Sequence, residues 1–489
     1  MKVGSFSVAP AAAIVIVLWS GNALAQSAPV TGSLVDVAAS ANFNALERAA
    51  ARANQATYNR LFNACSLGQG VCSAGDQIVF ANTRELVETA NELQGTGSTQ
   101  FSLGLDSEGL GFALRWTAAE EFAGQGDATT KFASSQLSAL ATRLAVLRWG
   151  VSGLRRASND AAGDSDILLA DAHGLKGGGA SGDLAESYRW GSFIDGSFGY
   201  GSKDPTDLED AFDFDSQEVT VGVDYRFSPR LVAGVIVGYS DKEIDFDSAQ
   251  SIVDGGIVSD GVSGILFGML EGDRAYLTAS IGYQQLTHDT TRRITYPSFN
   301  PTVESVDSTA TSSADSSALL ATASTGYPFR LGAFAIEPTI DLSYSDITVD
   351  AFTETSRAAD GESDPFDLRV GDQSIESLVV APALKLQYVL RPRFGTLIPY
   401  VIGRYHAELS NDARAISAQY ADALQQLADA PGSDFALSTD EPDDEYYTIA
   451  GGMTVVLGNG LNGYLQYMKV LEFENYDDSV ITGGFRYEF

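Results

Sequence analysis

The sequence predicts an all-β transmembrane barrel of 12 antiparallel strands, with an α-helix in its lumen and a small, mainly α-helical N-terminal segment. From about residue 187 to the C-terminus, apolar and polar residues alternate with a period of two, as in strands with one apolar face. The connections alternate between tight turns and long acidic stretches. Charged and small residues occupy the polar faces, and aromatic residues gather at the ends of the apolar faces. This distribution is expected for strands with lipid outside and a polar lumen inside.

The composition excludes some classes of partner. Asp and Glu number 64 against 30 Lys and Arg, which gives a formal net charge of −34. Nucleic acid is excluded because the sequence has no basic patch to displace its counterions. The acidic stretches, such as 440–445, lack the spaced ligands and the glycine of a dedicated Ca²⁺ site, so solvated loops are favoured over metal binding. We predict no metal and no cofactor.

Residues 1–25 have the pattern of a signal peptide. Lys2 precedes an apolar run, and small residues at 23–25 predict cleavage after Ala25. The run is too short to span a bilayer readily, and an uncleaved anchor helix is the less favoured alternative. Export would place Cys65 and Cys72 in an oxidising compartment. There we expect them to form one disulfide that contributes about 2–3 kcal/mol.

Residues 26–130 are predicted to be a short helical segment. One or two helices are expected within 33–65 and another over 74–94. No Ser–His–Asp or Cys–His arrangement can be assembled within this segment. The chain's three histidines lie outside it, and they are His173, His288 and His406. We therefore predict no catalytic residues and no enzymatic activity.

Residues 131–157 have a helical period instead. Leucines at steps of three and four form one stripe of a helix, and arginines accompany them. These residues are Leu137, Leu140, Arg143, Leu144, Leu147, Arg148 and Arg155. A helix of this length measures about 39 Å, enough to cross a membrane core about 30 Å thick, and a 12-strand barrel has room for about one helix. We predict that it lies in the lumen; an amphipathic helix packed on a small domain is the alternative.

The arginines of this helix are expected to pair with carboxylates on the inner face of the barrel. The candidates are Asp195, Asp224, Glu337 and Asp341. Residues 158–186 follow as a linker, and their path is left open.

Residues 187–489 are predicted to form the barrel, in which an even number of strands places both ends on one side. Strands are expected at 187–201, 216–228, 231–245, 257–270, 275–289, 314–328, 333–349, 375–390, 396–409, 444–457, 463–474 and 478–489. In the last strand Phe485, Tyr487 and Phe489 share the apolar face, which we expect to contact lipid. A soluble β-sandwich is the less favoured alternative.

The chain resembles the translocator domain of classical autotransporters, the type V secretion proteins, over about residues 130–489. Phe485, Tyr487 and Phe489 are similar to the terminal signal that the outer-membrane assembly machinery reads in that family. The stretch "QLSALATRLAVLRWG" looks like the family's linker helix, and 190–201 and 396–409 look like its first and ninth strands. The linker 158–186 is longer than in a compact member, and Asn159-Asp160 replaces the Asn-Asn pair of self-cleaving members, so no autocleavage is expected.

This resemblance implies a Gram-negative outer-membrane protein that exports and anchors its own short N-terminal segment at the cell surface, with adhesion as a candidate role. The implied partners are outer-membrane lipid, the barrel assembly machinery and periplasmic chaperones, and the surface ligand is unknown. The alternative is a passive outer-membrane channel whose N-terminal region stays in the periplasm as a plug.

Overall fold

The computed structural model describes most of the helical segment and the barrel. The described residues are 33–68, 70–130, 189–246, 253–358, 366–410, 414–421, 435–441, 443–457 and 460–489. The predicted signal peptide 1–25, lumen helix 131–157 and linker 158–186 lie outside the described residues.

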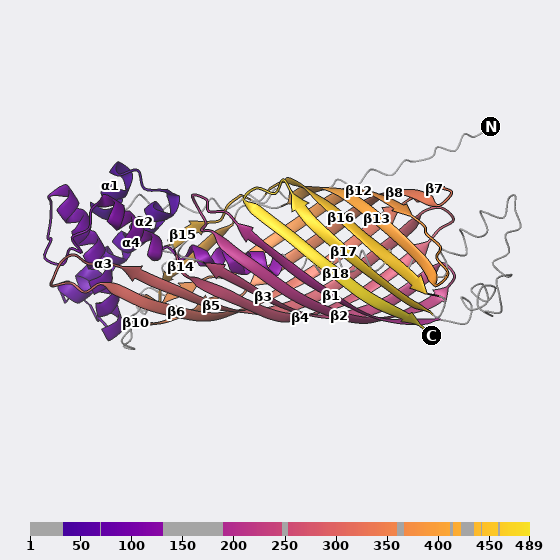
Figure 1. Cartoon of the computed structure of the whole chain (residues 1–489). Coiled ribbons are helices and arrows are strands. Elements are labelled where there is room, and N and C mark those ends of the chain that lie inside the picture. Colours follow the sequence, from indigo (N-terminus) through magenta and orange to yellow (C-terminus); the bar gives the residue numbers. More distant parts are fainter. Residues whose placement is uncertain are drawn as a thin grey trace, which may run out of the picture.

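Twelve antiparallel strands close into a barrel, as the sequence predicts (Figure 1). They are β1 (Trp190–Lys203), β2 (Phe212–Ser228), β3 (Leu231–Phe246), β4 (Gly255–Glu271), β5 (Tyr276–Tyr296), β6 (Val306–Gly326), β8 (Phe334–Val349), β12 (Gln373–Tyr388), β13 (Gly395–Ser410), β16 (Glu445–Leu457), β17 (Leu461–Leu471) and β18 (Tyr476–Glu488). The last strand pairs with the first, with Gly191 opposite Glu488 and Lys203 opposite Tyr476, so the sheet has no open edge at this seam.

Short strands extend the sheet at both ends. β7 (Phe329–Leu331) pairs with β8, and β10 (Thr355–Ala358) pairs with the outer part of β6. A separate four-stranded sheet has the order β15-β14-β11-β9. Its strands are β9 (Phe352–Thr353), β11 (Leu368–Val370), β14 (Ala415–Tyr420) and β15 (Phe435–Ser438).

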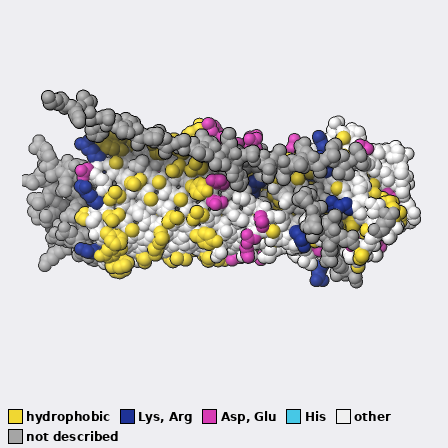
Figure 2. Space-filling view, turned by 180° about the vertical axis from the view of Figure 1, so that it is seen from behind, with side chains coloured by type: hydrophobic (Ala, Val, Ile, Leu, Met, Phe, Trp, Pro, Cys, Tyr) yellow, Lys and Arg dark blue, Asp and Glu magenta, His cyan; other side chains and the backbone are white. Residues whose placement is uncertain are grey.

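The outside of the barrel carries an apolar band, visible as yellow side chains in Figure 2. On β3 the outward side chains from Leu231 to Tyr239 are apolar and, apart from the half-buried Ala233, exposed, whereas the next outward residues are Asp241 and Glu243. The band on this strand thus covers residues 231–239, close to the 9–11 residues or so that a tilted transmembrane strand needs. The rest of the strand continues beyond the band into water.

The two ends of the barrel differ. At the turn end, tight turns join β2 to β3, β4 to β5, and β12 to β13, and the C-terminus lies there (Figure 1). At the loop end the longer connections gather, and the helices of residues 33–116, which we call the cap, lie over them (Figure 1).

The cap contains α1 (Ser33–Ser40), α2 (Ala45–Leu61) with the π-helical turn η1 (Phe62–Ser66), α3 (Ala74–Gln94) and α4 (Ser107–Trp116). Capping boxes at Asn44 and Ser73 satisfy the first amides of α2 and α3. Gly95 ends α3 at φ +66°, a left-handed conformation that glycine adopts without steric cost. None of the helices in the described part of the chain is both long and apolar enough to cross a bilayer.

Candidate functional site: the occupied mouth of the barrel

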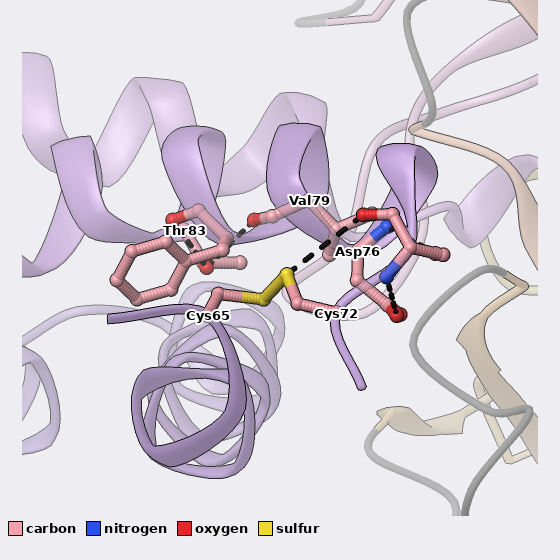
Figure 3. The surroundings of a disulfide bond; sticks show 7 residues. Cys65, Cys72, Asp76, Val79 and Thr83 are labelled. Atoms are coloured by element: carbon pink, nitrogen blue, oxygen red, sulfur yellow. Dashed lines mark hydrogen bonds between the residues drawn. A yellow bond between two sulfur atoms is a disulfide. The ribbon is translucent and has the colours of Figure 1, made fainter. Parts of the chain in front are cut away.

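The structure describes two of the predicted groups of site residues. Cys65 and Cys72 form a disulfide with a Cα–Cα distance of 5.2 Å, which ties η1 to the start of α3 beside Asp76 and Val79 (Figure 3). Phe485, Tyr487 and Phe489 lie exposed on the outer face of the C-terminal strand at the turn end. Two groups lie outside the described residues: the predicted cleavage position at Ala25, and the helix residues Leu137, Leu140, Arg143, Leu144, Leu147, Arg148 and Arg155.

Residues 117–130, which we call the mouth segment, connect the cap to the inside of the barrel. Ala119 has φ 63°, a left-handed conformation that is uncommon for residues other than glycine and that turns the chain after α4. The 3₁₀ turn η2 (Glu120–Phe122) follows, and residues 123–130 are helical and largely buried between the strands at the loop end (Figure 1). The chain therefore enters the lumen from the loop end.

Polar contacts fix the helical part of the mouth segment in the lumen. The Gln125 amide donates to the Thr290 hydroxyl (3.0 Å), and the Gln284 amide donates to the Thr129 carbonyl (3.3 Å). The Thr129 hydroxyl lies 3.2 Å from His288 Nε2, and His288 Nδ1 lies 2.8 Å from Ser259 Oγ. Both ring nitrogens of this buried histidine thus have partners, and its role here is to hold the segment.

An acidic side chain of the mouth segment reaches the opposite wall. Asp127 pairs with Arg414 at 3.4 Å and accepts a hydrogen bond from the Tyr476 hydroxyl. Because Arg414 precedes β14 and Tyr476 begins the C-terminal strand, this carboxylate links the segment to parts of the chain 287 and 349 residues away.

Two buried arginines organise the start of the mouth segment. Arg115 pairs with Glu120 at 2.6 Å and also with Asp210. Arg292 donates to both carboxylate oxygens of Glu354, at 3.1 and 2.7 Å, and its Nη1 lies 3.4 Å from the carbonyl oxygen of Trp116. The contacts of Arg115 with Asp210 and of Arg292 with Trp116 join the cap to the barrel and its loops. The pairs with Glu120 and Glu354 hold the two arginines in place.

This cluster holds more acidic than basic groups. The carboxylates of Asp210, Glu120, Glu121 and Glu354 surround only two guanidinium groups. Burial raises the pKa of Glu120 to about 7, against the opposing effect of Arg115. Burial likewise raises the pKa of Glu121 well above its usual range, and its carboxylate oxygens accept no hydrogen bond from any described residue. The surroundings of the mouth segment therefore favour the protonated forms of Glu120 and Glu121.

Apolar packing surrounds these charges. One buried core runs from the cap helices through the mouth segment to the outer ends of the strands. Within it the Phe122 ring meets the Phe352 ring edge-on, with 5.0 Å between centroids. At Gly124 a Cβ would come 2.9 Å from Ile257 Cδ1, so the helix lies against the wall at a distance that only glycine allows without a shift. The cap and the barrel mouth are thus one packed unit.

The loop-end connections of the barrel also form hydrogen bonds with the cap. β5 and β6 extend past the apolar band and are joined at 297–305, where the Phe299 amide donates to the Leu103 carbonyl (2.7 Å). The Asn300 side-chain Nδ2 donates to the Ser102 carbonyl (2.8 Å). From the small sheet, the Tyr420 hydroxyl donates to Asn54 Oδ1 on α2 (2.9 Å).

Deeper in the lumen, the wall has an apolar and a charged side. The apolar side, which we call the apolar wall, is the buried cluster of Phe193, Val232, Ile236, Ile265, Phe267 and Met269 on β1, β3 and β4. On the charged side Asp341 pairs with Arg404 (3.1 Å). Near the seam Asp224 pairs with Arg486 (2.6 Å). These two predicted partners of the lumen helix are thus already paired within the barrel.

The other predicted carboxylates are also inward. Asp195 and Glu337 are buried, and Glu337 accepts a hydrogen bond from the Tyr276 hydroxyl (3.1 Å). His406 stacks on Tyr446, with ring centroids 4.3 Å apart. Within the described ranges, no three His, Cys, Asp or Glu side chains are arranged to hold a metal ion.

Residues 192–468, more than half of the chain, match the autotransporter beta-domain family. Among solved structures, the chain is similar to the translocator domain of the autotransporter NalP from Neisseria meningitidis, with 14% identity, 63% of this chain and 92% of that chain covered, and a TM-score of 0.46. The beta domain of the Bordetella autotransporter BrkA is 14% identical, with 62% of this chain and 100% of that chain covered and a TM-score of 0.42. The transport unit of the autotransporter AIDA-I from Escherichia coli is 12% identical, with 70% of this chain and 99% of that chain covered and a TM-score of 0.38. No curated protein sequence matches the chain.

Proposed function

The chain belongs to the autotransporter family of outer-membrane proteins, and from this we propose that its barrel exports its own N-terminal segment and keeps it at the cell surface as a cap. One observation carries the proposal: the cap lies at the loop end and shares a buried core with the outer ends of the strands. In outer-membrane barrels short turns face the periplasm and long loops face outside. The proposed cap is therefore extracellular.

The cap is proposed to remain attached. Its contacts with the barrel and its loops include the buried ion pair of Arg115 with Asp210, a shared apolar core, and the hydrogen bonds of residues 297–305. A passenger released after export would gain nothing from such contacts. We therefore favour a display function, with the surface of residues 33–116 available to an unknown ligand and adhesion as the candidate role.

The domain organisation we propose keeps the sequence-based boundaries and adds one refinement. A signal peptide ending at Ala25, an exported segment 26–130, a lumen helix 131–157, a linker 158–186 and a barrel 187–489 would form the full chain. The refinement is that the lumen segment begins at about residue 117, because residues 123–130 already lie among the strands.

The proposed lumen helix would find a suitable surface in the barrel. Its leucine stripe would pack on the apolar wall, where Gly222 and Gly234 leave room for the rings of Phe193 and Phe267. Disulfide crosslinking tests this: cysteine at Leu137, Leu140, Leu144 or Leu147 is combined with Ile236→Cys in a chain in which Cys65 and Cys72 are serine. At least one leucine position should crosslink, whereas Arg143→Cys should not. Crosslinking of Arg143→Cys alone would contradict the arrangement.

Assembly is proposed to follow the family's route. Periplasmic chaperones would deliver the unfolded barrel, and the assembly machinery would read Phe485, Tyr487 and Phe489, whose side chains are exposed on the outer face of β18. We assign no chemical reaction to the barrel, which is a transport domain.

Protease shaving of intact cells tests the proposed export. An epitope tag is inserted at the exposed stretch 96–100 of the cap, and in a matched chain the same tag is inserted at the turn 271–274. The cap tag should bind antibody and be lost on intact cells, and the turn tag should survive until the outer membrane is broken. Protection of both tags would favour the alternative of a channel with a periplasmic plug.

A further inference from the structure

Arginines gather at the turn end of this otherwise acidic protein. We propose that this end binds the phosphate headgroups of anionic phospholipids in the inner leaflet of the outer membrane. The arginines, which we call the basic rim, are Arg189, Arg230, Arg274, Arg330, Arg391 and Arg393. They are scattered along the sequence, and only closure of the barrel brings them to one level.

The basic rim lies directly beyond a girdle of aromatic residues. Arg189 donates to the Tyr225 hydroxyl (3.4 Å), and the Tyr225 ring lies 4.9 Å from that of Trp190. In the same way Arg274 donates to the Tyr327 hydroxyl (3.3 Å). Aromatic girdles mark the boundary between acyl chains and headgroups. Guanidinium groups that bond the phenol oxygens from the water side therefore lie at the depth of lipid phosphates.

Among the described residues, positive charge predominates at this level. The acidic side chains there are Glu271, Asp273 and Glu488; Asp273 pairs with Arg230 at 2.7 Å, and Glu488 is buried beside Arg486. Figure 2 shows Lys and Arg side chains at this edge of the apolar band and Asp and Glu side chains at the opposite edge. In a chain of net charge −34, a positive rim is a local reversal that suits an anionic partner.

A lipid fits this rim better than a protein does. The arginines precede β1 and occupy the connections after β2, β4, β6 and β12, so they are spread around most of the circumference. A protein partner would need a patch on one side, whereas a lipid annulus surrounds the barrel. The planar guanidinium group also binds phosphate through paired hydrogen bonds.

Fluorescence quenching of Trp190 by brominated lipids tests the proposal, because this side chain is half exposed at the girdle. The full mature chain carries Trp116→Phe and Trp149→Phe, so that Trp190 is the reporter. It is reconstituted into phosphatidylcholine vesicles that contain equal amounts of either dibrominated phosphatidylglycerol or dibrominated phosphatidylcholine. Phosphatidylglycerol should be preferred roughly three- to fivefold, and added salt should reduce this preference.

Removal of the nearest charges gives the decisive comparison. Arg189→Gln with Arg230→Gln should bring the preference close to one, whereas Lys469→Gln, near the opposite edge of the band, should leave it unchanged. Equal quenching by the two lipids, or a preference that survives the double change, overturns the proposal. If selectivity is absent but the double variant accumulates poorly in the outer membrane of cells, the rim serves a periplasmic protein, and the lipid proposal fails.

Discussion

Replacement of Arg292 by glutamine tests whether buried charge holds the cap on the barrel. The Arg292 and Glu354 side chains are each about 1% exposed. Burial raises the pKa of the nearby Glu121, and the positive charge of the arginine opposes this rise. Arg292→Gln leaves both carboxylates buried without this cation. Removing one partner of a buried pair costs about 3–5 kcal/mol. Opening of the mouth should therefore become more frequent by two to four powers of ten, since each factor of ten corresponds to about 1.4 kcal/mol.

Amide hydrogen exchange of the full-length protein in detergent measures this opening. Exchange should accelerate in α4 and in residues 123–130, and it should stay unchanged in residues 461–465 of β17, which pair with β18 at the turn end, away from the mouth. The double variant Arg292→Met, Glu354→Leu should recover most of the protection, because an apolar pair of similar size replaces both charges. A loss below about 1 kcal/mol in the single variant, or equal losses in both, would refute the reasoning.

Three further predictions concern other parts of the molecule. Because burial raises the pKa values of Glu120 and Glu121, the closed mouth binds protons that the open mouth releases. Protease protection of residues 117–130 should therefore be greatest below the ordinary carboxyl pKa of about 4.5 and should weaken as the pH rises through about 7. Glu121→Gln should reduce this dependence of protection on pH. Cys65→Ser with Cys72→Ser should cost the cap about 2–3 kcal/mol, seen as faster exchange in α2 and α3 with unchanged barrel melting. Phe489→Ser should lower the amount of barrel in the outer membrane without reducing the heat stability of the folded barrel, because the Phe489 ring is exposed on the lipid-facing side. The control Leu384→Ser, at an exposed lipid-facing position of β12, should leave assembly unchanged.

The period-two pattern was sufficient to predict the barrel strands, because each strand must present apolar side chains to lipid. The pattern failed where strands leave the lipid. The sequence predicts strands at 275–289 and 314–328, whereas β5 extends to Tyr296 and β6 begins at Val306. Their outer parts, rich in Ser, Thr and charged residues, continue to pair in water, where no lipid-facing signal is required.

The occupied mouth could not be predicted in the same way. The stretch that contains Glu120, Glu121 and Asp127 has no amphipathic stripe, and adjacent acidic residues ordinarily indicate a solvated loop. Glu120 and Glu121 are buried and Asp127 is half-buried at the mouth. Arg115 pairs with Glu120 from nearby in the sequence, whereas Arg292 and Arg414, which lie near Glu121 and Asp127, come from far along it. Alternation identifies which face of a strand is inward, but it does not identify the partner that lies opposite across the lumen.

The shared core bears on how export could proceed without a nucleotide. The Phe122 ring packs against Phe352 of the four-stranded sheet, and the core that contains both also includes barrel residues such as Ile257 at the loop end. Under the proposed function, a segment still in the periplasm lacks these partners and cannot complete its core, whereas a segment that has passed through the lumen finds them at once. Burial of apolar surface is favourable, and the segment can bury this surface only on the outer side of the membrane. Folding there therefore opposes movement of the segment back through the lumen. Under the proposed function, the barrel would supply both the route and the surface on which the exported segment folds.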